Sequence, residues 1–188
     1  MRPLAPILAA LIAPLLVVLA LQQDQRHNEH RLSEVAGEIA GRNVSVHCPG
    51  MLKRLVDISP NAGTVYFDGN GEPADFTELD EDTCSTLDDF AEGDTGASDQ
   101  LKVARALHVL AHESSHLAGI RDEAAADCYG LQRTEFAAES LGANAPDARR
   151  LAVFALEERQ VTAPADYRSS ECRNGGELDL DSGSDVWP

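Results

Sequence analysis

The sequence predicts an α+β protein that is mostly helical, with a small β element and two disulfides. Three long segments, residues 100–118, 122–140 and 147–160, carry helical patterns with few residues that would break a helix. Only two short segments, residues 44–47 and 64–67, have the character of strands. Four widely spaced cysteines without a C-x-x-C pair favour two disulfides over a cluster of zinc thiolates.

The chain opens with an uncharged run, residues 4–21, that is mostly Leu, Ala, Val and Ile. Such a run is typical of a secretory signal peptide or of a single membrane anchor. We expect residues 1–21 to be one or the other, and both place the protein outside the cell or at its surface. Residues 22–42 are polar with sparse apolar positions, which predicts a stalk or surface helix. A single domain is then expected over residues 43–188.

The expected β element begins with Val44–His47 and continues with Thr64–Phe67. The second strand ends at DGNGE, residues 68–72, which we interpret as a hairpin turn. A calcium loop beginning there would need a bidentate glutamate at its twelfth position, which is Leu79. Either strand could align an extended substrate by backbone pairing.

The chain is strongly acidic, with a net charge of −17 from 32 acidic and 15 basic residues. A surface of this charge repels nucleic acid and anionic lipid headgroups, so neither is expected as a partner. Acidic residues are dense between Glu72 and Asp94, where we expect a solvated face with a short helix around Cys84 to Phe90.

The helical half of the domain follows this acidic stretch. Residues 100–118 contain no Pro or Gly and are apolar on most faces, as expected of a buried helix. Gly119 ends that helix, and Asp122 is a natural N-cap for a second helix that runs to about residue 140. A third helix is expected over residues 147–160.

The four cysteines allow three disulfide connectivities. We expect Cys48 to pair with Cys84 and Cys128 with Cys172, because this pairing staples each half of the domain locally. The second bridge would fasten the helix that carries Cys128 to an irregular C-terminal tail. Disulfides persist in oxidising compartments, which agrees with an exported protein.

A metal-binding motif, H-E-x-x-H, lies inside the expected buried helix as His112, Glu113 and His116. Four residues advance a helix by about 400° and about 6 Å, so both imidazoles leave one face and converge on one ion. Glu113 lies beside them and is placed to act as general base on a water that the metal activates. The pattern indicates a Zn²⁺ site, and the alternative interpretation is a pair of surface histidines.

A catalytic zinc site needs a third protein ligand and one open position, and the sequence offers two acids for the third ligand. With Asp122 as the ligand, H-E-x-x-H-x-x-G-x-x-D is complete, and it resembles the aspartate variant of the metzincin pattern. Metzincins also have a methionine turn downstream of the motif. Both methionines here, Met1 and Met51, lie upstream.

The second interpretation uses E-x-x-A-D, which is Glu123 to Asp127 on the following helix. Over residues 104–131 the chain resembles gluzincins, in particular membrane-associated zinc endopeptidases. The resemblance implies a metallopeptidase-like core of two packed helices, with Glu123 as third ligand and Asp127 orienting a ligand histidine. Glu123 follows His116 by only seven residues, fewer than in that family, so the turn must be tight. We favour Glu123, because Asp122 is better used as the helix cap.

Peptide hydrolysis also needs a group that stabilises the tetrahedral oxyanion. Three side chains are candidates by their chemistry alone, namely His108, Tyr129 and Tyr167. His108 lies one helical turn before His112 on the same face. The nucleophile is expected to be water, because no Ser or Cys has a recognisable nucleophilic setting.

The sequence therefore predicts a zinc-dependent metallopeptidase, secreted or at the cell surface, that acts on a peptide or protein substrate. It would contact the membrane through its N-terminal segment if that segment is not cleaved. Two alternatives stay open, a non-catalytic zinc-stabilised envelope or binding protein and a disulfide-stabilised helical domain without metal. The phrase HESSHLAGIRDEAAADCYGLQ also resembles a type of small exported actinobacterial protein, from which no activity carries over.

Overall fold

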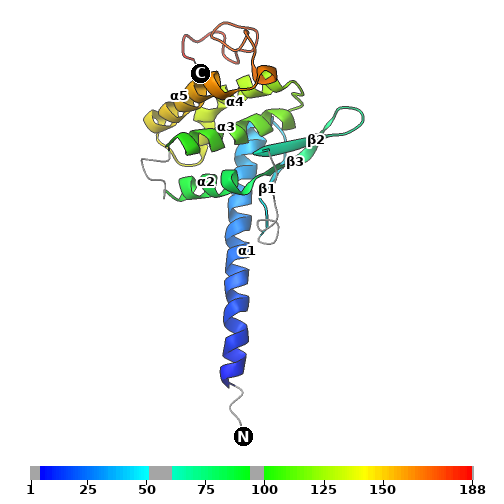
Figure 1. Cartoon of the computed structure of the whole chain (residues 1–188), viewed down its shortest axis with the longest axis vertical. Helices are drawn as coiled ribbons and strands as arrows, with labels where there is room; N and C mark the ends of the chain where they lie inside the picture. The colour runs from blue at the N-terminus through cyan, green and yellow to red at the C-terminus, as the bar shows by residue number, and fades with distance from the viewer. Residues whose placement is uncertain (1–4, 51–60, 94–99, 188) are drawn as a thin grey trace.

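A long helix carries a head of four further helices and a small sheet (Figure 1). The computed structural model describes residues 5–50, 61–93 and 100–187. These residues form five α-helices, three strands and a 3₁₀ helix. The predicted class, mostly helical with a small β element and two disulfides, is confirmed.

The first helix, α1 (Ala5–Ala40), is continuous from the apolar run into the polar segment after it. Its first part projects from the head, and its last part packs into the head (Figure 1). Leu32, Val35 and Ala36 are buried there, at the spacing of one helix face. Within the described part of the chain, no helix has both the length and the apolar character that a membrane span needs. Residues 1–4 of the expected leader lie outside the described residues.

The sheet has three strands, β1 (Ser45–His47), β2 (Gly63–Phe67) and β3 (Pro73–Leu79), in the order β1-β3-β2. Strand β3 pairs in parallel with β1 and antiparallel with β2, so β2 lies at an edge. The two predicted strands are confirmed to within a residue. Strand β3, which the sequence analysis did not predict, lies between them.

The segment DGNGE forms the hairpin turn that was predicted between β2 and β3. The amide of Asp68 donates to the carbonyl of Glu72 at 2.9 Å, and the Asp68 carboxylate accepts from the amides of Asn70 and Glu72. Gly71 has a φ of +85°, a conformation that glycine adopts without strain.

The remaining helices are α2 (Glu81–Glu92), α3 (Gln100–Leu117), α4 (Glu123–Ser140) and α5 (Ala145–Thr162), followed by the 3₁₀ helix η3 (Ala165–Tyr167). Helices α3, α4 and α5 confirm the three predicted long helices to within two residues at each end. Helix α2 is longer than the short helix expected around Cys84. Asp122 caps α4 as predicted, because its carboxylate accepts from the amide of Ala125 at 2.9 Å.

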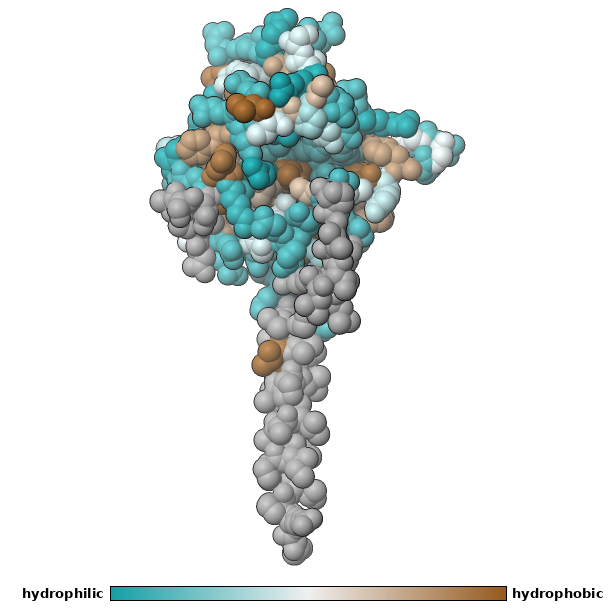
Figure 2. Space-filling model, in the orientation of Figure 1, coloured by the Kyte–Doolittle hydropathy of each residue, from teal (hydrophilic) through white to brown (hydrophobic). Residues whose placement is uncertain are grey.

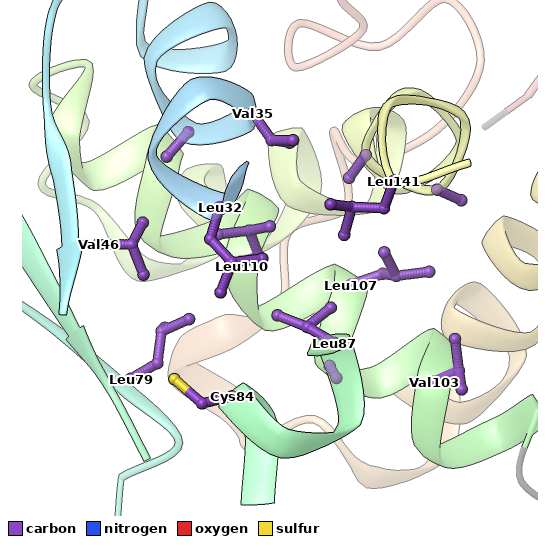
Figure 3. Packing of buried hydrophobic residues seen from close by; sticks show 14 of the residues in the cluster. Leu32, Val35, Val46, Leu79, Cys84, Leu87, Val103, Leu107, Leu110 and Leu141 are labelled. Carbon is purple, nitrogen blue, oxygen red and sulfur yellow. The ribbon is translucent and has the colours of Figure 1, made fainter. Parts of the chain in front are cut away.

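The core surrounds α3, which packs against α1, α2, α4, α5 and the sheet. Figure 3 shows Leu110 of α3 beside Leu32 of α1, with Leu79 and Val46 of the sheet close by. The face of the molecule in Figure 2 is mostly hydrophilic, with scattered apolar residues, as expected of this acidic composition. Helix α3 therefore lies at the centre of the core, where close packing restricts the side chains that it carries.

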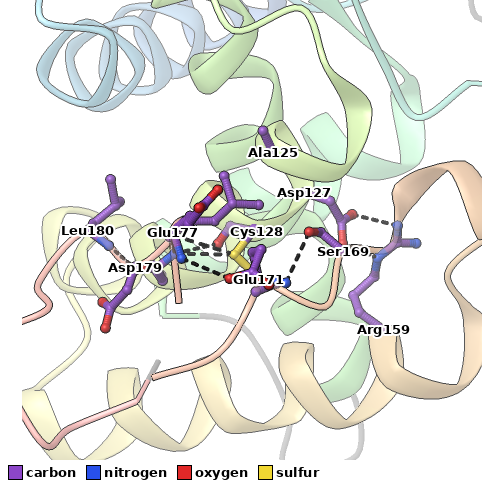
Figure 4. Close-up of a disulfide and its surroundings, with 12 residues drawn as sticks. Ala125, Asp127, Cys128, Arg159, Ser169, Glu171, Glu177, Asp179 and Leu180 are labelled. Carbon is purple, nitrogen blue, oxygen red and sulfur yellow. Dashed lines mark hydrogen bonds and ion pairs between the residues drawn. A yellow bond between two sulfur atoms is a disulfide. The ribbon is translucent and has the colours of Figure 1, made fainter. Parts of the chain in front are cut away.

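Both expected disulfides are confirmed. Cys48 bonds to Cys84 and ties β1 to α2, whereas Cys128 bonds to Cys172 and ties α4 to the C-terminal segment (Figure 4). The tail is irregular after η3, as predicted from its sequence.

Candidate metal centre

Helix α3 brings His112 and His116 together on one face. Their Nε2 atoms lie 3.0 Å apart, and both side chains are buried. The spacing follows from the helix, because residues four apart lie one turn above each other. Both rings point into a pocket of about 710 Å³ that β2, α3, α4, α5 and η3 line.

Glu123, the first residue of α4, completes the group. Its Oε2 atom lies 3.3 Å from Nε2 of His112 and 3.3 Å from Nε2 of His116. The short gap of seven residues closes because Gly119 turns the chain sharply, with a φ of +96°. The alternative acid, Asp122, is exposed and caps α4 with its carboxylate. Of the two acids, the structure therefore brings Glu123, not Asp122, to the histidines.

A hydrogen bond to the backbone fixes the orientation of the His116 ring. Its Nδ1 lies 2.6 Å from the carbonyl oxygen of Ile120, so Nδ1 carries the proton and donates it. This tautomer leaves the lone pair of Nε2 directed at Glu123 and His112. A histidine that donates through one nitrogen and ligates through the other is the usual arrangement in metal sites.

The ring of His112 is neutral. Burial, together with the neighbouring His108 and His116, lowers the pKa of His112 to about 3. A neutral imidazole keeps a lone pair for a metal ion, whereas a protonated one has none. The Nδ1 atom of His112 lies 3.9 Å from the carboxylate of Asp127, the residue expected to orient a ligand histidine.

Asp127 is buried among His108, His112 and Arg159. His108 Nε2 lies 3.1 Å from Asp127 Oδ1, and Arg159 forms an ion pair with the same carboxylate (Figure 4). Burial raises the pKa of Asp127, but the hydrogen bond from His108 and the charge of Arg159 outweigh it and lower the pKa overall. Asp127 is therefore ionised, and His108 is bonded to it instead of being free to bind an oxyanion.

Among the residues that the structure describes, two overlapping groups of side chains have the spacing of metal ligands. The first is His112, His116 and Glu123, and the second is His108, His112 and Asp127. Ligand atoms about 2.1 Å from a tetrahedral ion lie about 3.4 Å from one another. The first group has separations of 3.0 Å and 3.3 Å and no Lys or Arg partner within residues 5–50, 61–93 and 100–187, whereas Arg159 neutralises Asp127 in the second. The first group fits a cation better.

Glu113 lies beside the first group and has an unusual environment. The residue is only 6% exposed, and its Oε2 atom has no hydrogen-bond partner among the described residues. Burial, and then the charge of Glu123, raises the pKa of Glu113 to about 8. A cation held by the neighbouring ligands would offset both effects and favour the carboxylate.

Two glycines allow the close approach of other elements to this site. A Cβ atom at Gly63 of β2 would lie 2.5 Å from Cγ of Glu113, so only glycine lets β2 approach that side chain. A Cβ atom at Gly130 of α4 would lie 2.9 Å from the backbone nitrogen of His112. Neither glycine was predicted from the sequence to lie at the site.

The two tyrosine candidates differ in position. Tyr167 of η3 stacks on His112 with ring centroids 5.7 Å apart, and its phenol lies close to the Glu123 carboxylate. Burial and the charge of Glu123 raise the pKa of Tyr167 to about 12, so the phenol keeps its proton. Tyr129 is half-buried on α4 and does not line the pocket.

Further residues of the pocket were not predicted from the sequence. Phe67, Glu158 and Arg159 come from elements far from the motif, and only tertiary packing brings them to the site. Arg105 lies on α3 two turns before His112, and Arg121 lies in the turn after α3, so their spacing from the motif could have indicated them.

Comparisons of this chain with protein-family models, with curated proteins and with solved structures find no match. The functional argument therefore depends on the geometry of the pocket.

Proposed function

We propose that this protein is a zinc-dependent metallopeptidase that hydrolyses peptide bonds. His112, His116 and Glu123 would hold the ion, and Glu113 would act as general base. The observation that carries the proposal is the convergence of two Nε2 atoms and one carboxylate oxygen at 3.0–3.3 Å, beside a buried carboxyl oxygen without a partner.

Zinc suits this set of donors better than other common metal ions. Two imidazole nitrogens and one carboxylate are typical of catalytic zinc sites, whereas calcium and magnesium prefer oxygen ligands alone. Three protein ligands also leave a fourth position open towards the pocket. Zinc bound there would supply a Lewis acid that activates water and polarises the peptide carbonyl.

The chain's own residues supply the proton transfer and the charge stabilisation. Glu113 has one carboxyl oxygen free to accept a proton from water and later to return it to the leaving amine. Tyr167 keeps its hydroxyl proton and lies against His112 and Glu123, where it can donate to the oxyanion. His108 and Asp127 would instead position the ring of His112.

Strand β2 supports the binding of an extended substrate. It is an edge strand of the sheet, and its residues Gly63, Thr64, Val65 and Phe67 line the pocket. A peptide that pairs with this edge would run past Glu113, which packs against Gly63. Of the two predicted strands, β2 is therefore the one that supports substrate alignment.

The two disulfides are consistent with an oxidising, extracellular environment. We propose that the enzyme is secreted or held at the cell surface through its N-terminal segment, and that its substrates are peptides or proteins encountered there.

Replacement of the general base tests the catalytic proposal. Glu113→Gln is expected to retain zinc, because Glu113 is not a ligand, and to lose cleavage of a random peptide library by about 10²–10⁴-fold. Zinc content and cleavage rate would be measured for the wild type, for Glu113→Gln and for the exposed control Glu139→Gln. Equal cleavage by wild type and Glu113→Gln would refute the role of Glu113. Bound zinc without cleavage in the wild type would instead support a zinc-stabilised binding protein.

A further inference from the structure

Three arginines line the pocket, and two of them are neutralised by acids. Arg105 donates to Glu158 at 2.8 Å through its Nε, and Arg159 pairs with Asp127. Arg121 is exposed at the pocket and has no carboxylate within ion-pair distance in the described part of the chain. In a protein with 32 acidic residues and a net charge of −17, an arginine left without an acid beside a pocket is unexpected.

The guanidinium of Arg121 is nevertheless held in place. It lies over the ring of Phe67, 5.6 Å from the centroid, and the Phe67 ring meets the edge of His116 with centroids 6.0 Å apart. The hairpin turn closes on its other side, because a Cβ atom at Gly71 would lie 2.6 Å from Nη1 of Arg121. Two ring contacts thus connect a positioned positive charge to one of the candidate zinc ligands.

We propose that Arg121 binds a carboxylate of the substrate, so that the enzyme prefers peptides that carry a carboxylate close to the scissile bond. This inference rests on the proposed peptidase function of the same pocket. An extended peptide rises about 3.3 Å per residue, so the two ring contacts span about four residues at most. The carboxylate is therefore either a free C-terminus or an Asp or Glu side chain within about four residues of the bond.

The charge distribution makes this contact selective. The acidic surface repels anionic peptides at long range, so such a peptide gains affinity only where a cation meets its carboxylate directly. A planar guanidinium bonds a carboxylate through two parallel hydrogen bonds, and Arg121 is exposed at the pocket while it lies over Phe67. Arg105 and Arg159 cannot take this role without giving up Glu158 and Asp127.

Peptide binding tests the inference without depending on catalysis. Three pools of random hexapeptides would be offered to zinc-loaded Glu113→Gln protein. One pool has free C-termini and no Asp or Glu, the second is amidated and has no Asp or Glu, and the third is amidated and contains both acids. We expect about tenfold tighter binding of the first pool, the third pool or both relative to the second. The pool that is preferred identifies the source of the carboxylate.

The same measurement on arginine variants assigns the preference. In the Glu113→Gln background, Arg121→Ala should remove the tenfold preference over the second pool, whereas Arg121→Lys should keep part of it. Arg133→Ala, which removes an exposed arginine of α4 outside the pocket, should keep all of it. Equal or undetectable binding of all three pools, or a preference that survives Arg121→Ala, overturns the proposal.

Cleavage of the same pools by protein with Glu113 intact separates this proposal from the proposed function. A preference in binding that depends on Arg121, without any cleavage, would refute the peptidase and leave the carboxylate site in place. Cleavage that depends on Glu113 but not on Arg121 would support the peptidase and refute the carboxylate site.

Discussion

Glu113 is enclosed where α3 meets β2, with one carboxyl oxygen paired to nothing in the described residues. Burial of an ionised carboxylate without a partner costs more than burial of the neutral acid, which is why the pKa of Glu113 rises to about 8. Below about pH 8, the folded protein holds this side chain in its protonated form unless a cation lies next to it. The cost is consistent with a residue kept for chemistry and not for stability.

In metal-free protein, Glu113→Gln is expected to remove a pH-dependent loss of stability. The folded state holds this proton up to about pH 8, whereas the unfolded chain loses it near 4.5. Between these values the folded state binds more protons, so stability falls as the pH rises, by about 1.4 kcal/mol per pH unit. The difference in unfolding free energy between variant and wild type, measured with urea and a chelator, should grow across this window and then level off. A constant difference would contradict the shift.

The sequence predicted those site residues whose relative positions one helix and one turn determine. His112, Glu113 and His116 lie within five residues of α3, and Glu123 follows after a turn that Gly119 makes possible. Tyr167 could be named only by its chemistry, because its place against His112 depends on the packing of η3. Contacts such as the one between Arg159 and Asp127 depend on tertiary structure and leave no pattern in the sequence.

At the scale of the elements, the turn between α3 and α4 sets the geometry of the proposed ligands. Gly119 has a φ of +96°, and the carbonyl oxygen of the next residue, Ile120, accepts a hydrogen bond from Nδ1 of His116. The last turn of α3 therefore positions a ligand ring while it reverses the chain. The tight spacing that departs from the gluzincin pattern is accommodated here.

Gly119→Ala should destabilise the fold and weaken zinc binding together. A Cβ atom at this position would meet nothing within 4 Å, so the cost is that of the backbone conformation alone, about 1–2 kcal/mol. Urea denaturation and zinc titration would measure the two effects. Gly69→Ala is the matched control, because Gly69 also has open space around it but no positive φ. Equal effects of the two variants would refute the role of the turn.

The predicted elements differ in how strongly the local sequence determines them. Asp122 and Asn144 mark helix starts through their capping hydrogen bonds, and the apolar positions of α3 match its burial. Strand β3 escaped prediction because Asp75, Thr77 and Glu78 interrupt its apolar pattern. Thr77 is nevertheless fully buried, and its hydroxyl donates to the carbonyl of Thr64 at 3.0 Å. Pairing with both neighbouring strands, not apolar alternation, makes β3 a strand.

At the scale of the whole molecule, the Cys128–Cys172 disulfide holds the C-terminal segment against the helices that carry the site. Tyr167 lies five residues before Cys172, so the bridge limits how far η3 can move from the pocket. The other disulfide joins Cys48 to Cys84, and neither of these residues lines the pocket. The Cys128–Cys172 bridge therefore restrains a segment that lines the pocket, whereas the Cys48–Cys84 bridge does not.

Removal of the Cys128–Cys172 bridge should lower the stability of the protein, and it should lower the cleavage rate more than removal of the Cys48–Cys84 bridge does. The Cys128→Ser, Cys172→Ser variant is expected to lose about 2–4 kcal/mol of stability and to retain zinc, because the proposed ligands lie outside the released segment. Its cleavage rate should fall further than that of the Cys48→Ser, Cys84→Ser variant, because only the former frees Tyr167. Denaturation, zinc content and cleavage rate would be compared at a temperature where both variants are folded. Equal loss of cleavage in both would contradict this role for the bridge.

The proposed ligands all lie between residues 112 and 123, whereas the walls of the pocket extend from Asn61 to Tyr167. Contacts of low sequence separation close early in folding, and distant ones close late. On the proposed function, a newly made chain would therefore capture its ion with a single pair of helices before the surrounding groove exists. Such a chain would hold its metal ion without peptidase activity. It would become able to cleave other chains only after its last quarter, which carries α5 and η3, had docked.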